Sequence, residues 1–326
     1  LKLTFAPIPI FIVLKLFHSI SDFKCNSKTI VTIGTFDGVH VGHKKILDKI
    51  TLSAQNSNLE SLVLTFFPHP RTVLQEGSEM KQLNTIDEKI ALLDKIGVEN
   101  LIIHPFDQEF SRLTAEDFVK TVLVDIFNVA KIVIGYDHRF GRNRTADIDD
   151  LIEFGKKYNF EVEQISVEEI NDVSVSSTKI RTALNEGEVA LANSFLNYPY
   201  SITGNIIKGK QLGRTIGFPT ANIHIKETYK QIPKDGVYVV RCEIDGNNFY
   251  GMMNIGVNPT TDTTNQQQKI EVHLFDFNGD IYEKSITVSF LKRIREEQKF
   301  ESVDALKNQL SLDKKTAIHY IENGNN

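Results

Sequence analysis

The segment Thr29–Ile50, TIVTIGTFDGVHVGHKKILDKI, decides the fold of the first half of this chain. Its apolar run Ile30–Ile33 predicts a buried strand, a glycine-bearing turn follows, and Lys44–Ser53 has the periodicity of an amphipathic helix. Glycine lets the backbone approach a phosphate closely, and the start of a helix presents free N–H groups to an anion. The segment therefore predicts a strand, turn and helix whose turn can bind a phosphate.

Apolar runs and helical patterns continue to alternate up to about residue 170. The expected strands are Ile30–Ile33, Leu62–Phe66, Leu101–His104, Lys131–Gly135 and Val162–Ile165, and the expected helices include Lys44–Ser53, Asp87–Ile96 and Asp117–Phe127. This alternation is typical of βαβ units on a parallel sheet. Because ligands of such sheets bind beyond the carboxyl ends of the strands, we expect the chemistry in the loops after Ile33, Phe66, His104 and Ile134.

The pattern changes after about residue 185, where short β-rich segments are separated by glycine-bearing turns. These segments are Tyr200–Ile207, Val237–Ile244, Phe249–Ile255, Ile270–Phe277 and Ser285–Leu291. Asp245-Gly246 and Asn278-Gly279 predict hairpins, because such pairs tolerate positive φ. We expect a small antiparallel barrel or sandwich, closed by a helix from Val303 to about Leu310, with room for another helix that reaches Glu322.

Composition bounds the classes of function. The chain has 326 residues, of which 41% are hydrophobic and 24% are charged, and this length allows two domains of about 100–200 residues. The formal net charge of -5 argues against nonspecific nucleic-acid binding, which usually depends on a basic excess, so we expect no nucleic-acid partner. Cys25 and Cys242 lie far apart without a C-x-x-C motif, which indicates neither a disulfide framework nor a zinc site and favours a cytoplasmic location.

The first residues form a largely apolar stretch, Leu3–Phe17, which is short for a membrane span and is interrupted by Pro7, Pro9 and Lys15. We expect an extension of unknown role and no membrane partner, with a weak membrane contact as the alternative. The domain boundary is expected between Leu184 and Tyr198. The expected limits are 1–13 for the extension, 14–185 for the first domain and 186–326 for the second.

The turn of the opening segment carries two histidines, His40 and His43, near the expected helix start. In that position both can donate to phosphoryl oxygens as negative charge builds up in a transition state. The alternative is a tight turn with surface histidines, and the combination of H-x-G-H with several glycines favours the first interpretation. The accompanying candidates for nucleotide binding are Gly34, Phe36, Asp37, Gly38 and Gly42.

A second candidate phosphate site is Ser176-Ser177-Thr178-Lys179-Ile180-Arg181, just ahead of a helix expected to run to Leu184. Hydroxyl groups and helix-start amides suit phosphate oxygens, and Lys179 and Arg181 can balance the charge of a leaving pyrophosphate. Taken alone, the segment would be a helix cap with solvated basic groups. Together the two motifs indicate nucleotidyl transfer.

The motifs G-T-F-D-G-V-H-V-G-H and S-S-T-K-I-R resemble the paired signatures of the nucleotidyltransferase superfamily, and specifically of prokaryotic bifunctional FAD synthetases. Phe66–Pro70 and Gly135–Gly141 are similar to two further segments of that family. The resemblance implies a Rossmann-like α/β nucleotidyltransferase domain in which His40 and His43 stabilise the attacked α-phosphate of ATP. It also implies that the outer phosphates of ATP are contacted by Ser177, Thr178 and Arg181.

The same resemblance implies that the flavin or the adenine lies near Phe67, Pro68, His69 and Asp137. Taken alone, Phe66–Pro70 is equally consistent with a rigid turn, because proline fixes φ and keeps the preceding residue extended. The chain departs from many relatives, which carry Phe or further glycines at the positions of His138, Asn143 and Ala146.

The second domain opens with the glycine-rich, cationic segment Gly204–Asn222, which can fold around a polyphosphate although it is not a Walker loop. The alternative for its first part is a mobile surface hairpin. Thr220 and Asn222 are two residues apart, so an extended backbone points both side chains to one face, where Mg²⁺ can lie beside phosphates. The candidate phosphate-binding residues of this segment are Gly204, Lys208, Gly209, Gly213 and Arg214.

The segment Glu271–Phe277 alternates so that Glu271, His273, Phe275 and Phe277 are expected on one side of a strand. A carboxylate there can accept the proton of an attacking hydroxyl group in phosphoryl transfer. An isolated glutamate at a strand edge is usually only exposed, so the interpretation depends on its neighbours.

Those neighbours, G-R-T-I-G-F-P-T-A-N and E-V-H-L-F-D-F-N-G-D, resemble the riboflavin kinase domain. The resemblance implies that Glu271 is the base for the riboflavin 5′-hydroxyl, that Thr220 and Asn222 bind Mg²⁺ with ATP, and that Asn254 supports the nucleotide or flavin site. Arg295–Phe300 resembles the flavin-side segment of the family, with Arg295 and Phe300 as candidate contacts, and a charged helix entry is the alternative.

The resemblance covers roughly Leu14 to Ser311 and implies two reactions that use ATP. Riboflavin would be phosphorylated to FMN, and FMN would then be adenylylated to FAD with release of pyrophosphate. The partners implied are riboflavin, FMN, FAD and ATP, with Mg²⁺ as cofactor. One alternative is a riboflavin kinase whose adenylyltransferase is weakened, and another is a non-catalytic module that senses flavin or binds RNA.

Overall fold

The computed structural model describes residues 13–24, 27–75, 77, 79–136, 138–166, 175–209, 212–257 and 268–324. The chain divides into two compact units. Unit 1 comprises Leu1–Met80 and Ile86–Ser174, and unit 2 comprises Lys81–Thr85 and Val175–Asn326. Apart from Val13, the expected extension at residues 1–13 lies outside the described residues.

The described strands of unit 1 form one parallel sheet in the order β1-β4-β3-β2-β5-β6. They are β1 (Lys15–Phe17), β2 (Thr29–Ile33), β3 (Glu60–Phe66), β4 (Asn100–His104), β5 (Val129–Gly135) and β6 (Glu161–Ile165). From β2 the chain winds outward through β3 to β4, and then returns to the other side of β2 as β5 and β6. The reversal between β2 and β5 is a topological switch point, where ligands of doubly wound folds bind.

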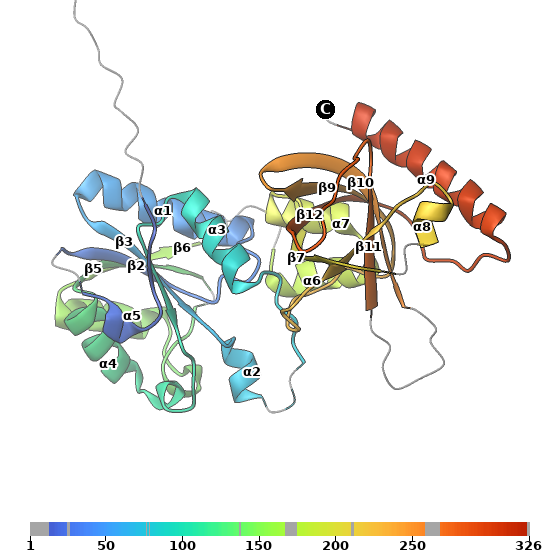
Figure 1. Cartoon of the computed structure of the whole chain (residues 1–326). Coiled ribbons are helices and arrows are strands. Elements are labelled where there is room, and N and C mark those ends of the chain that lie inside the picture. The colour runs from blue at the N-terminus through green and yellow to red at the C-terminus, as the bar shows by residue number, and fades with distance from the viewer. Residues whose placement is uncertain are drawn as a thin grey trace, which may run out of the picture. The chain divides into compact units, whose positions relative to one another are not determined.

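Helices cover both faces of this sheet (Figure 1). On one face, Ile30 of β2 packs with residues of α1 (Val41–Ser57) and α3 (Ile86–Ile96). On the other face, Val31 and Ile33 pack with the opposite helical layer, because neighbouring residues of a strand point to opposite sides. That layer contains α4 (Ala115–Asp117), the π-helical segment η3 (Phe118–Ile126) and α5 (Ile148–Tyr158). The remaining short helices of the unit are η1 (Ile20–Asp22), α2 (Pro70–Leu74), η2 (Phe110–Arg112) and η4 (Arg142–Arg144).

The doubly wound class and the strands β2 to β6 are as the sequence predicts, whereas the edge strand β1 is not among the expected strands and several helix limits differ. α1 begins at Val41, two residues before the start expected near His43, because the side chain of His40 caps it. The helix expected over Asp117–Phe127 is a short α-helical turn that continues as η3. A segment of two turns is too short for its apolar spacing to separate an α-helical from a π-helical period.

Unit 2 is built on a closed antiparallel barrel with the strand order β10-β11-β8-β7-β12-β9, which decides between the barrel and sandwich alternatives. Its strands are β7 (Ser201–Ile207), β8 (Ala221–His224), β9 (Gly236–Ile244), β10 (Asn247–Val257), β11 (Gln268–Leu274) and β12 (Ser285–Arg295). Inward-pointing residues such as Ile202, Val240 and Val288 form its core. The helices α6 (Ser177–Glu186) and α7 (Val189–Leu196) pack against this core, and α8 (Leu212–Thr215) precedes β8.

A segment from the middle of the first half completes unit 2. Leu83 is fully buried in the barrel core. Its neighbour Gln82 accepts at its carbonyl from the Gln231 N–H at 2.8 Å, and donates its own N–H to the Tyr229 carbonyl at 2.7 Å. The ammonium of Lys230 donates to the Leu83 carbonyl at 2.7 Å. Residues 81–85 are therefore part of the second folding unit, although they precede α3 in the chain.

The last helix, α9 (Val303–Asn323), lies along the outside of the barrel (Figure 1). Its Ala317 packs with Val239, Met252 and Phe275 on the outer face of the strands. The expected interruption after Leu310 is wrong. The hydroxyl of Ser311 donates to the carbonyl of Lys307 one turn earlier, which satisfies this polar group inside a continuous helix.

Of the two expected hairpins, only the first is found. Asp245 and Gly246 have φ values of 50° and 76° and connect the paired strands β9 and β10. The hairpin expected at Asn278-Gly279 is wrong, because β11 pairs with β10 and β8 while β12 pairs with β7 and β9. The chain must cross to another part of the barrel between these strands, so a tight turn cannot join them.

The end of β11 also corrects the expected alternation. The strand ends at Leu274, and Asp276 has a φ of 50°, which turns the chain. As a result Phe275 packs in the outer cluster under α9, whereas Phe277 packs against the cluster of the barrel core. The alternation predicted that Phe277 shares a face with Glu271, and this prediction is wrong.

Among the described helices, none combines the length and the apolar character that crossing a bilayer requires.

Candidate functional site

The turn between β2 and α1 has an unusual backbone. Phe36, Gly38 and Val39 have φ values of 46°, 85° and 39°. A β-branched residue with positive φ is a genuine outlier, and such strain persists only where the surrounding packing enforces it. The side chains of Phe36 and Val39 are buried in the core of unit 1, which supplies that packing. The turn therefore has one well-defined conformation at the switch point of the sheet.

The two histidines of this turn are in contact. His40 is the N-cap of α1, and its Nδ1 accepts from the backbone N–H of His43 at 3.4 Å. The rings stack with centroids 3.6 Å apart, and the ring of Phe36 meets His43 edge-on at 5.2 Å. The Nδ1 atom of His43 is buried and has no hydrogen-bond partner among the described residues. Unsatisfied buried polar atoms are rare in folded proteins, and a catalytic role is one of their explanations.

The pKa of His43 lies well below the ordinary value of a histidine. Burial is the main cause, and the charges of His40 and of Lys89 add to it. The imidazole is therefore neutral near neutral pH, so it can donate one hydrogen bond without binding a proton from solvent.

Lys89 is the functional candidate that the sequence analysis missed. It lies on α3 with only 1% of its surface exposed, and its ammonium donates to the carbonyl of Thr35 in the turn at 2.7 Å. Burial lowers its pKa to about 8, and the buried carboxylate of Asp37 opposes that shift. A signal was present in the sequence, because Lys89 is three residues after Ile86 and four before Leu93, on the apolar face of the helix.

The flavin candidates of unit 1 follow β3. The N–H of Phe67 donates to the carbonyl of His104 at 3.1 Å, and the side chain of Phe67 packs against the core. Pro68 is exposed and follows a cis peptide bond. His69 is the N-cap of α2, where its Nδ1 accepts from the Arg71 N–H at 3.1 Å. Asp137 lies outside the described residues.

The sequence predicts that Ser176–Arg181 lies just ahead of a helix. In the structure this segment instead forms the beginning of the helix. Ser176 is the N-cap of α6 and accepts from the N–H of Lys179 at 3.3 Å. Ser177 and Thr178 therefore lie in the first turn of a ten-residue helix, and Arg181 follows one turn later. Their backbone N–H groups belong to the end of a helix that favours anions. The histidine turn belongs to unit 1, and α6 belongs to unit 2.

In unit 2, strand register brings three polar candidates into one row. Glu271 pairs with Asn222 on β8 and with Asn254 on β10. Residues directly opposite each other on neighbouring strands point to the same face. That face is the outside of the barrel, because Ile270 and Val272 on either side of Glu271 point into the core. We call Asn222, Glu271 and Asn254 the polar row.

The carboxylate of Glu271 is 22% exposed, and its Oε1 lies 2.7 Å from the ammonium of Lys269 on the same strand. His273, the next outward residue, donates from Nδ1 to the carbonyl of Pro219 at 2.8 Å. Burial lowers the pKa of His273, with the Pro219 hydrogen bond opposing it and Lys314 adding to it. His273 thus ties β11 to the segment that carries Thr220.

The residues expected to hold Mg²⁺ fit such an ion. A Cβ atom on Gly209 would lie 2.0 Å from Nδ2 of Asn222, so a larger residue there would displace this amide from its place under the cationic segment. A Cβ atom on Gly213 would lie 2.2 Å from the carbonyl oxygen of Phe218 and near the Thr220 hydroxyl. Neutral hydroxyl and amide oxygens, completed by phosphate and water, are ligands that Mg²⁺ accepts. The described residues contain no cluster of three or more His, Cys, Asp or Glu side chains that could hold a metal.

The other phosphate candidates of unit 2 lie on β7, on the segment that follows it and on α8. A Cβ atom on Gly204 would lie 2.6 Å from the His224 carbonyl, so β7 and β8 approach closely there. Lys208 is exposed, with its ammonium 5.7 Å from the ring of Tyr282, and Arg214 is exposed on α8.

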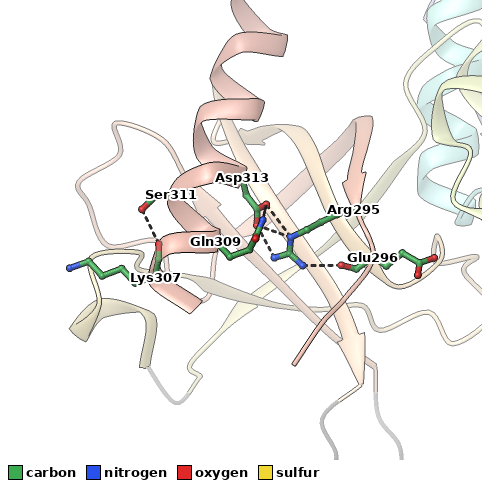
Figure 2. A network of polar contacts seen from close by, with 6 residues as sticks. All are labelled: Arg295, Glu296, Lys307, Gln309, Ser311 and Asp313. Carbon is green, nitrogen blue, oxygen red and sulfur yellow. Dashed lines mark hydrogen bonds and ion pairs between the residues drawn. The ribbon is translucent and has the colours of Figure 1, made fainter. Parts of the chain in front are cut away.

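Arg295 ends β12 in a buried polar network (Figure 2). Its Nε lies 3.0 Å from each carboxylate oxygen of Asp313, its Nη2 donates to the same group at 2.7 Å, and its Nη1 donates to the Glu296 carbonyl at 2.8 Å. Asp313 is 2% exposed and also accepts from Gln309 at 2.9 Å. The guanidinium lies 5.7 Å from the centre of the Phe300 ring. Arg295 thus holds α9 and residues 296–300. Its pairing with Val237 leaves two strands, β9 and β10, between Arg295 and Glu271.

Comparisons with known proteins match each half of the chain. A model of the FAD synthetase family matches residues 22–179, and a model of the riboflavin kinase family matches residues 196–321. The bifunctional riboflavin kinase/FMN adenylyltransferase of Buchnera aphidicola subsp. Schizaphis graminum is 39% identical over 304 residues, covering 92% of this chain and 96% of the relative. The protein of the same name from Bacillus subtilis is 38% identical over 303 residues, covering 91% and 94%.

A solved structure supports the fold of the whole chain. The crystal structure described as a macrolide-efflux protein from Streptococcus pneumoniae has a TM-score of 0.85 and 33% sequence identity, and the match covers 94% of this chain and 99% of that one. The similarity extends over both units, so the order of α/β domain, barrel and final helix is shared.

Proposed function

This chain belongs to the family of bifunctional riboflavin kinase/FMN adenylyltransferases, and from that premise we propose which residues carry its two reactions. The chain has an FAD synthetase domain and a riboflavin kinase domain. It transfers a phosphoryl group from ATP to riboflavin, which gives FMN, and it transfers an adenylyl group from a second ATP to FMN, which gives FAD and pyrophosphate.

The polar row is the observation that carries the kinase assignment. Riboflavin attacks with an alcohol, which must lose its proton as the new bond to phosphorus forms, so this reaction needs a base. Glu271 supplies the carboxylate, and Lys269 orients it at 2.7 Å. Asn222 and Asn254 lie beside Glu271 in register, which supports a nucleotide site against the same face of the barrel.

Thr220 and Asn222 would hold Mg²⁺, which would neutralise part of the negative charge of the ATP phosphates. Around it, the phosphates would contact the glycine-rich segment, where Gly209 allows the backbone to close over Asn222. His273 keeps this segment in place through the Pro219 carbonyl. The residues proposed to contact the phosphates are Gly204, Lys208, Gly209, Gly213 and Arg214.

Adenylyl transfer requires different groups, because the attacking phosphate of FMN is already an anion and no base is needed. His40 and His43 would donate to the oxygens of the attacked α-phosphate, and the start of α1 would attract the same charge. The strained, tightly packed turn supports this role, since its donors are held in place before the reaction. The outer phosphates would contact Ser177, Thr178 and Arg181 at the start of α6.

The flavin contacts are proposed on the family resemblance. In the adenylyltransferase they are Phe67, Pro68, His69 and Asp137, and in the kinase they are Arg295 and Phe300. The network of Arg295 with Asp313 supports an ordered segment at residues 296–300, beside which a flat ring could lie. We propose 14–185 and 186–326 as the limits of the two family domains, which differ from the compact units in the assignment of residues 81–85 and 175–185. We also propose a cytoplasmic location, which the buried free thiol of Cys242 supports.

A product assay tests this function. Incubation of the protein with riboflavin and ATP is expected to give FMN first and then FAD with an equivalent of pyrophosphate. Accumulation of FMN without FAD would favour the alternative with a weakened adenylyltransferase, and saturable flavin binding without turnover would favour a sensing module.

A further inference from the structure

The side chain of Lys89 lies in the core of unit 1, where an ammonium is unfavourable unless it is compensated. Lys89 is 1% exposed on the apolar face of α3, next to the buried residue Leu93 on the following turn. Its ammonium donates to the Thr35 carbonyl at 2.7 Å. A buried charge on an otherwise apolar helix face stabilises a specific partner rather than the fold in general.

That partner is the strained turn. The Thr35 carbonyl precedes Phe36, whose φ is 46°, and it also accepts from the Thr65 hydroxyl of β3 at 3.2 Å. The same carbonyl is therefore held from two sides, by α3 and by β3. A peptide that is fixed in this way cannot rotate, which keeps the following residues in their positive-φ conformation.

Two titratable groups, Asp37 of the turn and His43 of α1, interact electrostatically with this ammonium. Asp37 is 1% exposed, and its negative charge opposes the pKa shift of Lys89. His43 carries an unfavourable interaction with the charge of its stacked neighbour His40 and a further one with the charge of Lys89. β3 presents the uncharged hydroxyl of Thr65. Lys89 thus acts on the position of the turn and on the protonation state of His43.

We propose that Lys89 is a positioning residue for adenylyl transfer, whose buried ammonium holds the turn through the Thr35 carbonyl and thereby keeps His43 in place. Lys89 contacts no substrate in this account, since its donor is directed at Thr35. The inference rests on the proposed role of His43 in the adenylyltransferase. It predicts that FAD formation depends on the charge of a residue that lies outside the signature motifs.

The test uses the full chain with Lys89→Met and Lys89→Arg. With Met, the kcat of FAD formation from FMN is expected to fall about 100-fold, because a small displacement of a catalytic group has effects of that order. KM for ATP should change little, and riboflavin phosphorylation in the same molecule should not change. The acid limb of the pH profile of FAD formation should move to higher pH, because His43 loses a neighbouring positive charge.

With Arg, the charge and the donor are restored, so most of the lost kcat should return. The wild-type rate of FAD formation should decline above about pH 8 as Lys89 loses its proton, and the Arg variant should keep its rate there, because an arginine remains charged. The comparison of the wild type with the Arg variant above pH 8 does not depend on the folding of the Met variant. Far-UV circular dichroism would show whether the Met variant is folded.

The proposal is wrong if Lys89→Met keeps the wild-type kcat and acid limb, or if Lys89→Arg has the same alkaline limb as the wild type. Thr65→Val provides a matched control, because it removes the other hydrogen bond to Thr35 without a change of charge and should leave both pH limbs in place. If His43→Asn retained FAD formation, the proposed function of the turn would fail. Loss of activity in His43→Asn together with unaffected Lys89 variants would overturn the role of Lys89 alone.

Discussion

The histidine turn of unit 1 and the polar row of unit 2 are assembled by different physical means. In the turn, Val39 has a φ of 39° and a buried ammonium fixes the backbone, so the geometry depends on distant packing. In the row, Glu271 is flanked by Asn222 and Asn254 through ordinary strand pairing. With the roles proposed above, the comparison teaches that a site that only positions phosphates and neutralises their charge can be buried and rigid, whereas a base that must exchange a proton remains accessible.

The chemical difference follows from the attacking groups. An alcohol needs a carboxylate to accept its proton, and Glu271 is partly exposed to solvent. A phosphate anion needs donors of hydrogen bonds, and His43 is kept neutral by its surroundings. Substitutions in one site should therefore leave the other reaction intact.

The largest expected effect is that of Glu271→Gln, which removes the proposed base and keeps the shape of the side chain. Riboflavin phosphorylation should slow about 10³-fold, within the range known for loss of a general base, while conversion of added FMN to FAD continues. Chromatography of the flavin products measures both rates. Glu243→Gln, at an exposed position of β9, is the matched control and should leave both unchanged. If Glu271→Gln slowed FAD formation from added FMN as strongly as riboflavin phosphorylation, the two sites would not be separate.

His43→Asn should have the reverse effect. FAD formation is expected to slow about 10²–10³-fold, as for the loss of one donor to a transition state, with FMN formation at the wild-type rate. His18→Asn, at an exposed position, serves as control. If FMN formation fell in parallel in a folded protein, the two sites would not be independent.

Asp313→Asn sharpens the comparison within unit 2, because it leaves the partly buried Arg295 guanidinium without its carboxylate. Removal of one partner of a buried ion pair costs about 3–5 kcal/mol, so the free energy of unfolding of unit 2 should fall by that order. Denaturant unfolding followed by circular dichroism measures it. Asp276→Asn, at an exposed turn position with positive φ that asparagine tolerates, should change it little. A neutral result for Asp313→Asn would show that the network in Figure 2 does not hold α9.

The smallest effect concerns pH. The pKa of folded His43 lies below that of the unfolded chain, so below about pH 6.5 the unfolded chain binds a proton that the folded protein does not. The stability of unit 1 should therefore decrease by about 1.4 kcal/mol per pH unit as the pH falls from that value toward the folded pKa. His43→Asn should lack this component. If the free energy of unfolding fell equally steeply with decreasing pH in the wild type and in His43→Asn, His43 would not be buried and neutral.

Local patterns in the sequence predict the parts of the fold that local chemistry determines. The strands β2 to β6 of the sheet follow from their apolar runs, and Asp245-Gly246 forms its hairpin because both residues adopt positive φ. Asn278-Gly279 has the same local signal but no hairpin, since strand order in the barrel is set by packing between distant segments. A single strand such as β8, with four residues, is too short for a periodic signal.

The candidate site shows the same limit. Glu271, Asn222 and Asn254 are far apart in sequence, and only the register of the barrel shows that they share one face. Lys89 could have been noticed as a charge on an apolar helix face, but its partner Thr35 is 54 residues away and contributes a backbone carbonyl, which no residue type reveals. Segment 81–85 joins unit 2 through backbone pairing, which is likewise invisible in composition.

The most direct test of the division between the two sites is complementation. Glu271→Gln and His43→Asn proteins are incubated with riboflavin and ATP, each alone and then mixed in equal amounts, and FAD is measured. The account predicts almost no FAD from either variant alone and sustained FAD formation in the mixture, because FMN made by the His43→Asn protein is adenylylated by the Glu271→Gln protein. A mixture that forms FMN but no FAD, although the Glu271→Gln protein adenylylates added FMN, would contradict it.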